Sequence, residues 1–205
     1  MLPESFAVVG AVIASLGGFQ YLYATIKGRA KPNRVTWLLW GLLPMVIFVA
    51  QRTQGVEGLS WVSFTAGFTP FLILAASFMN RNAYWQTTTF DYICMAFALL
   101  GIALWAITKD SNTAIVFSVA ADVAAGLPTL IKAYTHPETE SWLGYTISAA
   151  GFVVSILAIH SWNFANYGFV VYVAILNGLL AVLAFRGRSH HVSGPVGPES
   201  VEAID

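Results

Sequence analysis

The chain has 205 residues, of which 57% are hydrophobic and 10% are charged, and its formal net charge is zero. A soluble domain usually carries about 25% charged residues. A soluble chain of this length could not bury so much apolar surface, so the composition indicates an integral membrane protein. No basic stripe suggests a nucleic-acid partner. The single cysteine, Cys94, excludes an internal disulfide, and we expect it to be a buried, inert thiol.

A membrane-spanning helix needs about 20 mostly apolar residues. In chain order, seven segments satisfy this requirement: residues 5–26, 35–50, 59–79, 92–108, 111–131, 141–159 and 163–185. The fold class that follows is an all-α membrane protein with seven transmembrane helices. We expect the first segment to be a retained helix and not a cleaved signal peptide, because no basic residue precedes Lys27.

Lysine and arginine are distributed unequally between the two sets of connections. The connections after the second, fourth and sixth segments hold only Arg52 and Lys109. The connections after the first, third and fifth segments, with the polar tail, hold the other eight: Lys27, Arg29, Lys31, Arg34, Arg81, Lys132, Arg186 and Arg188. Because basic loops stay in the cytoplasm, we predict an outside N-terminus and a cytoplasmic C-terminus. We attribute Lys132 to this same bias. The compact loops favour the plasma membrane of a prokaryote, with an organelle membrane as the alternative.

The chain contains an internal repeat. A shift of 105 positions aligns residues 26–40 with residues 131–145 without a gap, and five of the fifteen positions are identical: Ile26, Lys27, Pro32, Trp37 and Leu38. The same shift carries the first, second and third segments onto the fifth, sixth and seventh. Equivalent helices are four spans apart, so both units have the same orientation. We therefore predict four regions: a three-helix repeat in 1–81, an inverting linker helix 4 in 82–110, a second repeat in 111–185 and a disordered cytoplasmic tail in 186–205.

Residues 128–132 (Pro-Thr-Leu-Ile-Lys) and 137–142 (Pro-Glu-Thr-Glu-Ser-Trp) resemble a PQ-loop motif. In that motif a Pro-Gln pair ends the first helix of a unit, and a basic loop and a Ser/Thr-Glu stretch follow. Thr129 stands where the glutamine would be, and the first unit has Tyr23-Ala24 in place of the pair. The resemblance to the SWEET and PQ-loop superfamily implies a transporter of small solutes such as sugars, amino acids or vitamin-like nucleosides. Nicotinamide-riboside transporters of the PnuC type share this architecture, and so do KDEL receptors, which bind peptide tails without transport.

Asp122 is the one charged residue of the predicted fifth span. A charge at the bilayer centre costs roughly 2.5–3.5 kcal/mol, so such residues usually face the bundle interior. Ser118 and Thr129 share its helical face and could line a cavity with it. We interpret Asp122 as a substrate contact or as a carboxylate that exchanges a proton during transport. An interhelical hydrogen bond is the alternative. Asp91 opens the fourth span, where the helix dipole stabilises a carboxylate.

Further polar residues in apolar segments are candidate substrate contacts. Asn177 lies midway along the last span, where the resemblance implies an asparagine that contacts a sugar. The matching position of the first repeat is Leu72, and Thr69 is the nearest polar residue on that face. Gln20 lies on the face of the first span that is equivalent to the face of Asp122. A packing role is open for Asn177, and Gln20 could instead reach interfacial water.

Aromatic residues and a proline mark the repeated loops as a candidate gate. Four aromatic residues begin the second and sixth spans at the predicted cytoplasmic end: Trp37, Trp40, Trp142 and Tyr145. We interpret them as an interfacial belt, with a cytoplasmic gate or a stacking wall as the alternative. Tyr23 and Pro128 occupy equivalent positions near the ends of the first and fifth spans, and Pro128 could kink its helix.

The prediction is a small-solute transporter that works by alternating access, with a midplane site between the two repeats and with proton coupling through Asp122 as an open option. A non-transporting receptor or sensor of the same fold is the alternative. A retinal photoreceptor is excluded, because residues 163–185 contain no lysine for the Schiff base. We expect no enzymatic activity, cofactor or metal site, since the sequence has no activated nucleophile beside a base. A small solute and membrane lipid are the expected partners, and a homo-oligomer is open.

Overall fold

The structure is a computed structural model that describes residues 2–83, 85–108 and 111–187. The described chain is all-helical, with seven α-helices and one short 3₁₀ turn: α1 (Ser5–Ile26), α2 (Arg34–Thr53), α3 (Gly58–Met79), α4 (Thr89–Thr108), α5 (Ser111–Thr135), η1 (Pro137–Thr139), α6 (Trp142–Leu157) and α7 (Phe164–Phe185). Lys109, Arg188 and nearly all of the predicted disordered tail lie outside the described residues.

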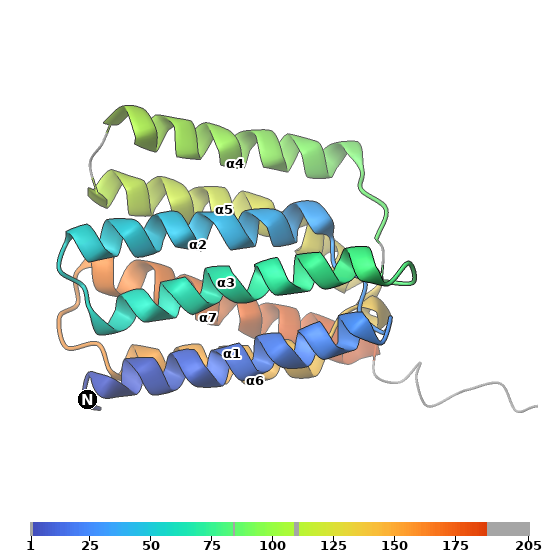
Figure 1. Ribbon diagram of the computed structural model, residues 1–205, viewed down its shortest axis with the longest axis horizontal. Helices are drawn as coiled ribbons and strands as arrows, with labels where there is room; N and C mark the ends of the chain where they lie inside the picture. The colour runs from blue at the N-terminus through green and yellow to red at the C-terminus, as the bar shows by residue number, and fades with distance from the viewer. Residues whose placement is uncertain (1, 84, 109–110, 188–205) are drawn as a thin grey trace, which may run out of the picture.

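The helices lie side by side and alternate in direction (Figure 1). The described connecting residues 27–33, 80–83, 85–88 and 136–141 therefore lie at one end of the bundle, which we call the Lys132 end. There the Lys31 amide donates to the Thr139 carbonyl at 2.9 Å. The connections 54–57 and 158–163 lie at the opposite end.

Local sequence explains where several helices begin and end. Asn33 caps α2, because its side chain accepts hydrogen bonds from the first free amides of that helix, and Ser141 and Asn163 cap α6 and α7 in the same way. Gly28 and Gly55 follow the ends of α1 and α2 with φ values of 71° and 75°. This left-handed conformation suits glycine and stops a helix.

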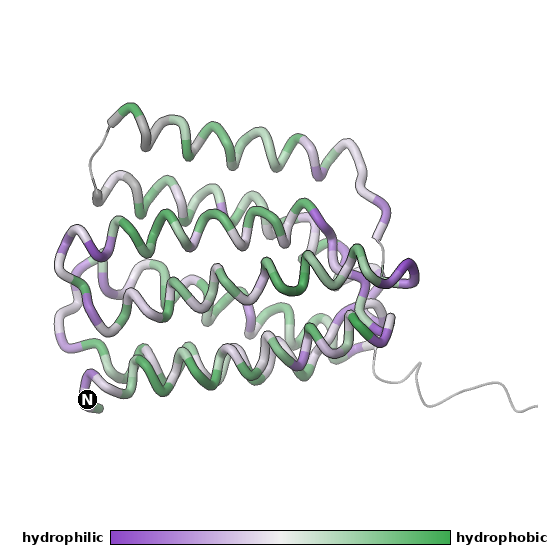
Figure 2. The backbone as a smooth tube through the Cα atoms, viewed as in Figure 1, coloured by the Kyte–Doolittle hydropathy of each residue, from purple (hydrophilic) through white to green (hydrophobic). Residues whose placement is uncertain are grey.

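Five of the described helices, α1, α2, α3, α5 and α7, are long and apolar enough to cross a membrane. The α6 helix is shorter, with 16 residues. Apolar residues also cover the outer faces, as Val8, Val12 and Leu16 do along α1. Figure 2 shows hydrophobic residues along the helices and hydrophilic residues gathered at their ends. A helix that is apolar on all sides suits lipid, so the fold is consistent with an integral membrane protein.

The helices form two groups of three that pack against each other. In one group α3 lies between α1 and α2, and in the other α7 lies between α5 and α6. Across the groups, α1 packs along α6 and α2 packs along α5, whereas α4 packs at the edge against α5 and α2 (Figure 1).

Small residues allow α1 and α6 to approach closely. A Cβ atom on Gly17 would lie 2.5 Å from the Gly144 carbonyl oxygen, and one on Gly151 would lie 2.3 Å from the Ala14 amide nitrogen. Glycine is therefore required at these crossings, as is common between membrane helices. Ser148 completes the contact by donating to the Ala14 carbonyl at 3.1 Å.

Candidate functional site

A cavity of about 90 Å³ lies between six helices, and α4 contributes nothing to its described lining. Small, aromatic and hydroxyl side chains predominate in its wall. The lining residues are Ala14, Ser15, Gly17, Gly18 and Tyr21 of α1; Trp37, Trp40 and Pro44 of α2; Thr65, Ala66, Thr69, Pro70 and Ile73 of α3; Asp122 of α5; Gly144, Tyr145, Ser148 and Phe152 of α6; and Phe169, Val173, Leu176 and Asn177 of α7.

Asp122 is the one carboxylate among the described residues that line this cavity, and no lysine, arginine or histidine joins it there. Its side chain is 2% exposed. One carboxylate oxygen, Oδ2, accepts a hydrogen bond from the Tyr172 hydroxyl at 2.8 Å. The other oxygen, Oδ1, is buried and has no partner in the described part of the chain. A buried carboxylate with one hydrogen bond is poorly compensated, so this atom is ready to accept a donor from a ligand.

An aromatic wall, formed by Tyr21, Trp37, Trp40 and Tyr145, bounds the cavity beside Asp122. The ring centroids lie 4.5 Å apart for Tyr21 and Trp37, 5.3 Å apart for Trp37 and Trp40, and 5.4 Å apart for Tyr21 and Tyr145. All four side chains are buried. The interpretation of Trp37, Trp40 and Tyr145 as an interfacial belt is therefore corrected, because belt residues contact lipid and water whereas these rings face the bundle interior.

Asn177 and Thr69, two of the predicted substrate contacts, also line the cavity. Both use a donor group within their own helix. The Asn177 amide donates to the Val173 carbonyl at 2.8 Å, and the Thr69 hydroxyl donates to the Thr65 carbonyl at 3.0 Å. Their remaining oxygen lone pairs can accept from a ligand.

Three other predicted contacts lie away from the cavity lining. Gln20 is half-buried between α1 and α6, where its side-chain oxygen accepts a hydrogen bond from the Ser141 hydroxyl at 2.5 Å. Ser118 and Thr129 are buried on α5 but do not line the cavity, and their hydroxyl oxygens have no partner among the described residues. The expected stripe along α5 is corrected in this respect: only Asp122 reaches the cavity, because other positions of that face pack against neighbouring helices.

The remaining candidate gate residues also lie outside the lining. Tyr23 is 53% exposed, and its ring lies 5.6 Å from Lys27 Nζ and 5.3 Å from the Arg29 guanidinium carbon. Two residues after Tyr21 correspond to about 200° around a helix, so the two tyrosines point in opposite directions. Pro128 is buried within α5, and Trp142 is half-buried against the ring of Phe185 at 5.3 Å.

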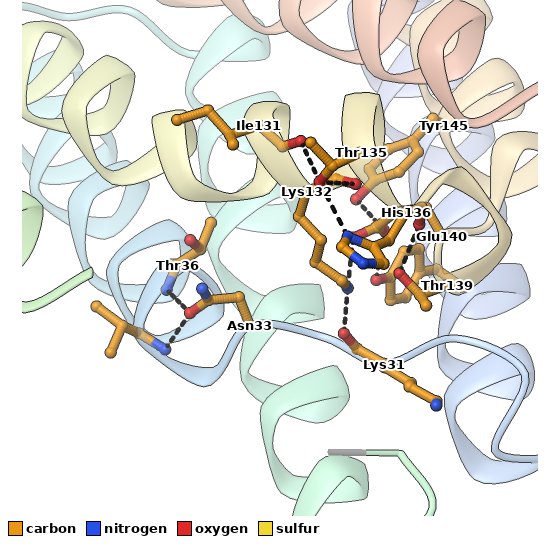
Figure 3. Close-up of polar contacts among 12 residues, drawn as sticks. Lys31, Asn33, Thr36, Ile131, Lys132, Thr135, His136, Thr139, Glu140 and Tyr145 are labelled. Atoms are coloured by element: carbon orange, nitrogen blue, oxygen red, sulfur yellow. Dashed lines mark hydrogen bonds and ion pairs between the residues drawn. The ribbon is translucent and has the colours of Figure 1, made fainter. Parts of the chain in front are cut away.

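A buried polar network lies next to the aromatic wall at the Lys132 end (Figure 3). The hydroxyls of Tyr21 and Tyr145 donate to Glu140 Oε2 at 2.7 and 2.8 Å. Glu140 Oε1 forms an ion pair with Lys132 Nζ at 2.8 Å, and both side chains are at most 1% exposed. Lys132 also donates to the Lys31 carbonyl. We call these residues the Lys132–Glu140 network.

Sequence reasoning did not select Tyr21, Lys132 or Glu140 as functional residues. Lys132 was attributed to the basic bias of the loops, but it is buried and paired. The sequence does contain a signal for this ion pair: Lys132 and Glu140 carry opposite charges and lie on the two sides of the Pro137 turn. The equivalent positions of the first repeat are Lys27 and Val35, so the pair is particular to the second repeat.

Within the described residues, no group of three or more His, Cys, Asp or Glu side chains could hold a metal ion. No protein-family model matches the chain, and neither a curated protein nor a solved structure matches it. The arrangement of the site is therefore the basis for a functional proposal.

Proposed function

We propose that this chain is a small-solute membrane transporter of the SWEET and PQ-loop type that works by alternating access. It has seven transmembrane helices, in two parallel three-helix repeats joined by α4, with the N-terminus outside and the C-terminus in the cytoplasm. The cavity carries the proposal. Three helices of each repeat line it, and its wall holds a buried carboxylate, Asp122, with one oxygen free to accept a donor.

Two hydrogen bonds support the relation between the repeats. Thr36 of α2 donates to the Ala125 carbonyl of α5 at 2.8 Å, and Ser141 near the start of α6 donates to the Gln20 side chain of α1 at 2.5 Å. Thr36 and Ser141 are 105 positions apart, and so are Gln20 and Ala125. The order of neighbouring helices is also equivalent in the two groups, α1-α3-α2 in one and α5-α7-α6 in the other, which agrees with the relation between the repeats.

The Lys132–Glu140 network supports a closed state at the predicted cytoplasmic end. Two of its hydrogen bonds cross between the repeats: Tyr21 donates to Glu140, and Lys132 donates to the Lys31 carbonyl. Rocking of one repeat against the other would break both contacts and open the cavity at this end. The aromatic wall, which contains Tyr21 and Tyr145, would move with these contacts.

Counterflow in proteoliposomes tests the proposal. Vesicles preloaded with an unlabelled sugar, amino acid, amine or nucleoside should take up the labelled compound of one class in a saturable manner. Asp122→Asn should abolish this uptake. Asp91→Asn is the matched control, because Asp91 is also a buried carboxylate but binds Asn33 and Thr88 away from the cavity. If an imposed pH gradient drives accumulation with the parent protein and not in protein-free vesicles, transport is proton-linked.

A receptor of the same fold is the second candidate, and the tight α1–α6 contact favours it. Gly17 and Gly151 hold α1 and α6 in backbone contact across the two groups, which restricts rocking. Saturable binding without counterflow in any solute class would support the receptor and refute the transporter.

A further inference from the structure

We infer that the cavity binds a small protonated amine, with Asp122 as its counter-ion and the aromatic wall as its enclosure. This inference rests on the proposed function, since it names the class of solute for the same site. Three features of the cavity support it independently: its charge, its walls and its size.

The charge of the cavity favours a cation with N–H donors. Asp122 Oδ1 is buried without a partner, and no basic side chain lines the described cavity. Lys132 of the same helix does not compensate this carboxylate, because it lies ten residues further along α5 and its ammonium is paired with Glu140. A protonated amine supplies both the missing charge and the missing donor. An anion would be repelled, and a neutral solute could supply the donor but not the compensating charge in a low-dielectric site.

The aromatic wall favours the same ligand. A cation is attracted to the faces of Trp and Tyr rings, and the attraction is larger where water is excluded. Tyr21 and Tyr145 are held in place by their hydrogen bonds to Glu140, so their rings are fixed before a ligand binds. Trp37 and Trp40 meet edge to face, with an interplanar angle of 78°, and complete the enclosure. Their indole N–H groups are buried without an acceptor among the described residues, and an ammonium group leaves them so; these residues act on the ligand through their ring faces.

The size of the cavity limits the ligand. Its volume of about 90 Å³ is smaller than the roughly 150 Å³ of a cavity that holds benzene. A short aliphatic amine fits this volume, whereas a sugar ring or a nucleoside would require the walls to move apart. The probe pair follows from this limit: isopropylammonium and its neutral analogue isopropanol have nearly the same shape and differ in charge.

The test measures binding of isopropylammonium, isopropanol and acetate to the full chain in detergent at neutral pH, by isothermal titration calorimetry. We expect saturable binding of isopropylammonium alone. Asp122→Asn should weaken it at least about tenfold, because a close charge pair is lost in a site of low dielectric. Asp91→Asn should leave the affinity unchanged, and Asp122→Glu should retain binding. The comparison of the three probes on the parent protein does not depend on whether a variant folds.

The outcomes separate this inference from the proposed function. Binding of isopropanol equal to that of isopropylammonium, unchanged affinity in Asp122→Asn, or no binding of the amine would each overturn the inference. If a neutral solute then shows counterflow, the transporter proposal stands without the amine. If the amine binds as expected and no solute class shows counterflow, the amine site stands and the transporter proposal fails.

Discussion

Replacing Glu140 with glutamine removes the negative charge from the Lys132–Glu140 network and keeps the shape of the side chain. In the parent protein this carboxylate accepts from two tyrosine hydroxyls and pairs with Lys132 at 2.8 Å. The variant leaves the buried Lys132 ammonium without its counter-charge, and it keeps only one acceptor oxygen for which Lys132 and the two tyrosine hydroxyls must compete. Breaking a buried ion pair by removing one partner costs about 3–5 kcal/mol, so we expect Glu140→Gln to lower the free energy of unfolding by that amount.

The assay is equilibrium unfolding in mixed micelles, followed by tryptophan fluorescence. Glu138→Gln is the matched control, because Glu138 is half-buried on the same η1 turn and lies outside the network. It should change the free energy of unfolding by no more than about 0.5 kcal/mol. The double variant Lys132→Met/Glu140→Leu should recover only part of the lost stability, since it removes both charges but leaves the buried Tyr21 and Tyr145 hydroxyls without their acceptor. A Glu140→Gln loss as small as that of the control would refute the reasoning, because it would mean that water reaches the pair.

Three other predictions concern helix packing and buried hydrogen bonds. Gly151→Ala should destabilise the protein by about 1–3 kcal/mol, because its Cβ would meet the α1 backbone. Gly178→Ala is the control: its Cβ would meet nothing within 4 Å, so it should be neutral or stabilising by up to about 1 kcal/mol. Equal shifts in melting temperature for the two variants would contradict this. Asn33→Ala should cost about 1–2 kcal/mol in chemical unfolding, since it removes the α2 cap and the 2.7 Å bond to Asp91, and an unchanged midpoint would exclude this role. Gln51→Leu should cost about 1–3 kcal/mol by the same measurement, because it leaves a hydroxyl of α3 and a carbonyl of α7 without their partner, and parent-like stability would show that water replaces it.

The helices follow closely from the sequence, because a long apolar stretch in lipid must satisfy its own backbone and so becomes a helix. Residues 5–26 were predicted for the first helix, and α1 covers Ser5–Ile26. The fifth was predicted to end at residue 131, but α5 continues to Thr135. Hydropathy ended the segment before Lys132, since it cannot show that this charge is paired inside the bundle.

Part of the candidate site was also visible in the sequence. Asp122, Asn177 and Thr69 stand out as polar residues in apolar spans, and all three line the cavity. Gln20 stands out equally but lies between α1 and α6, where it accepts a hydrogen bond from Ser141. Polarity therefore selected residues that avoid lipid, and it did not separate those at the cavity from those at a helix contact.

The sequence by itself determined the membrane class, the helical segments, the 105-residue shift and the isolated carboxylate. The tertiary structure decided which face of each helix lines the cavity and which charges meet. The physical reason is that lipid and a protein interior are both apolar, so hydrophobic periodicity does not tell the two sides of a membrane helix apart. Tyr21 and Tyr23 show this directly: they are the same residue type on the same helix, yet Tyr21 is 1% exposed in the aromatic wall and Tyr23 is 53% exposed on the outer face.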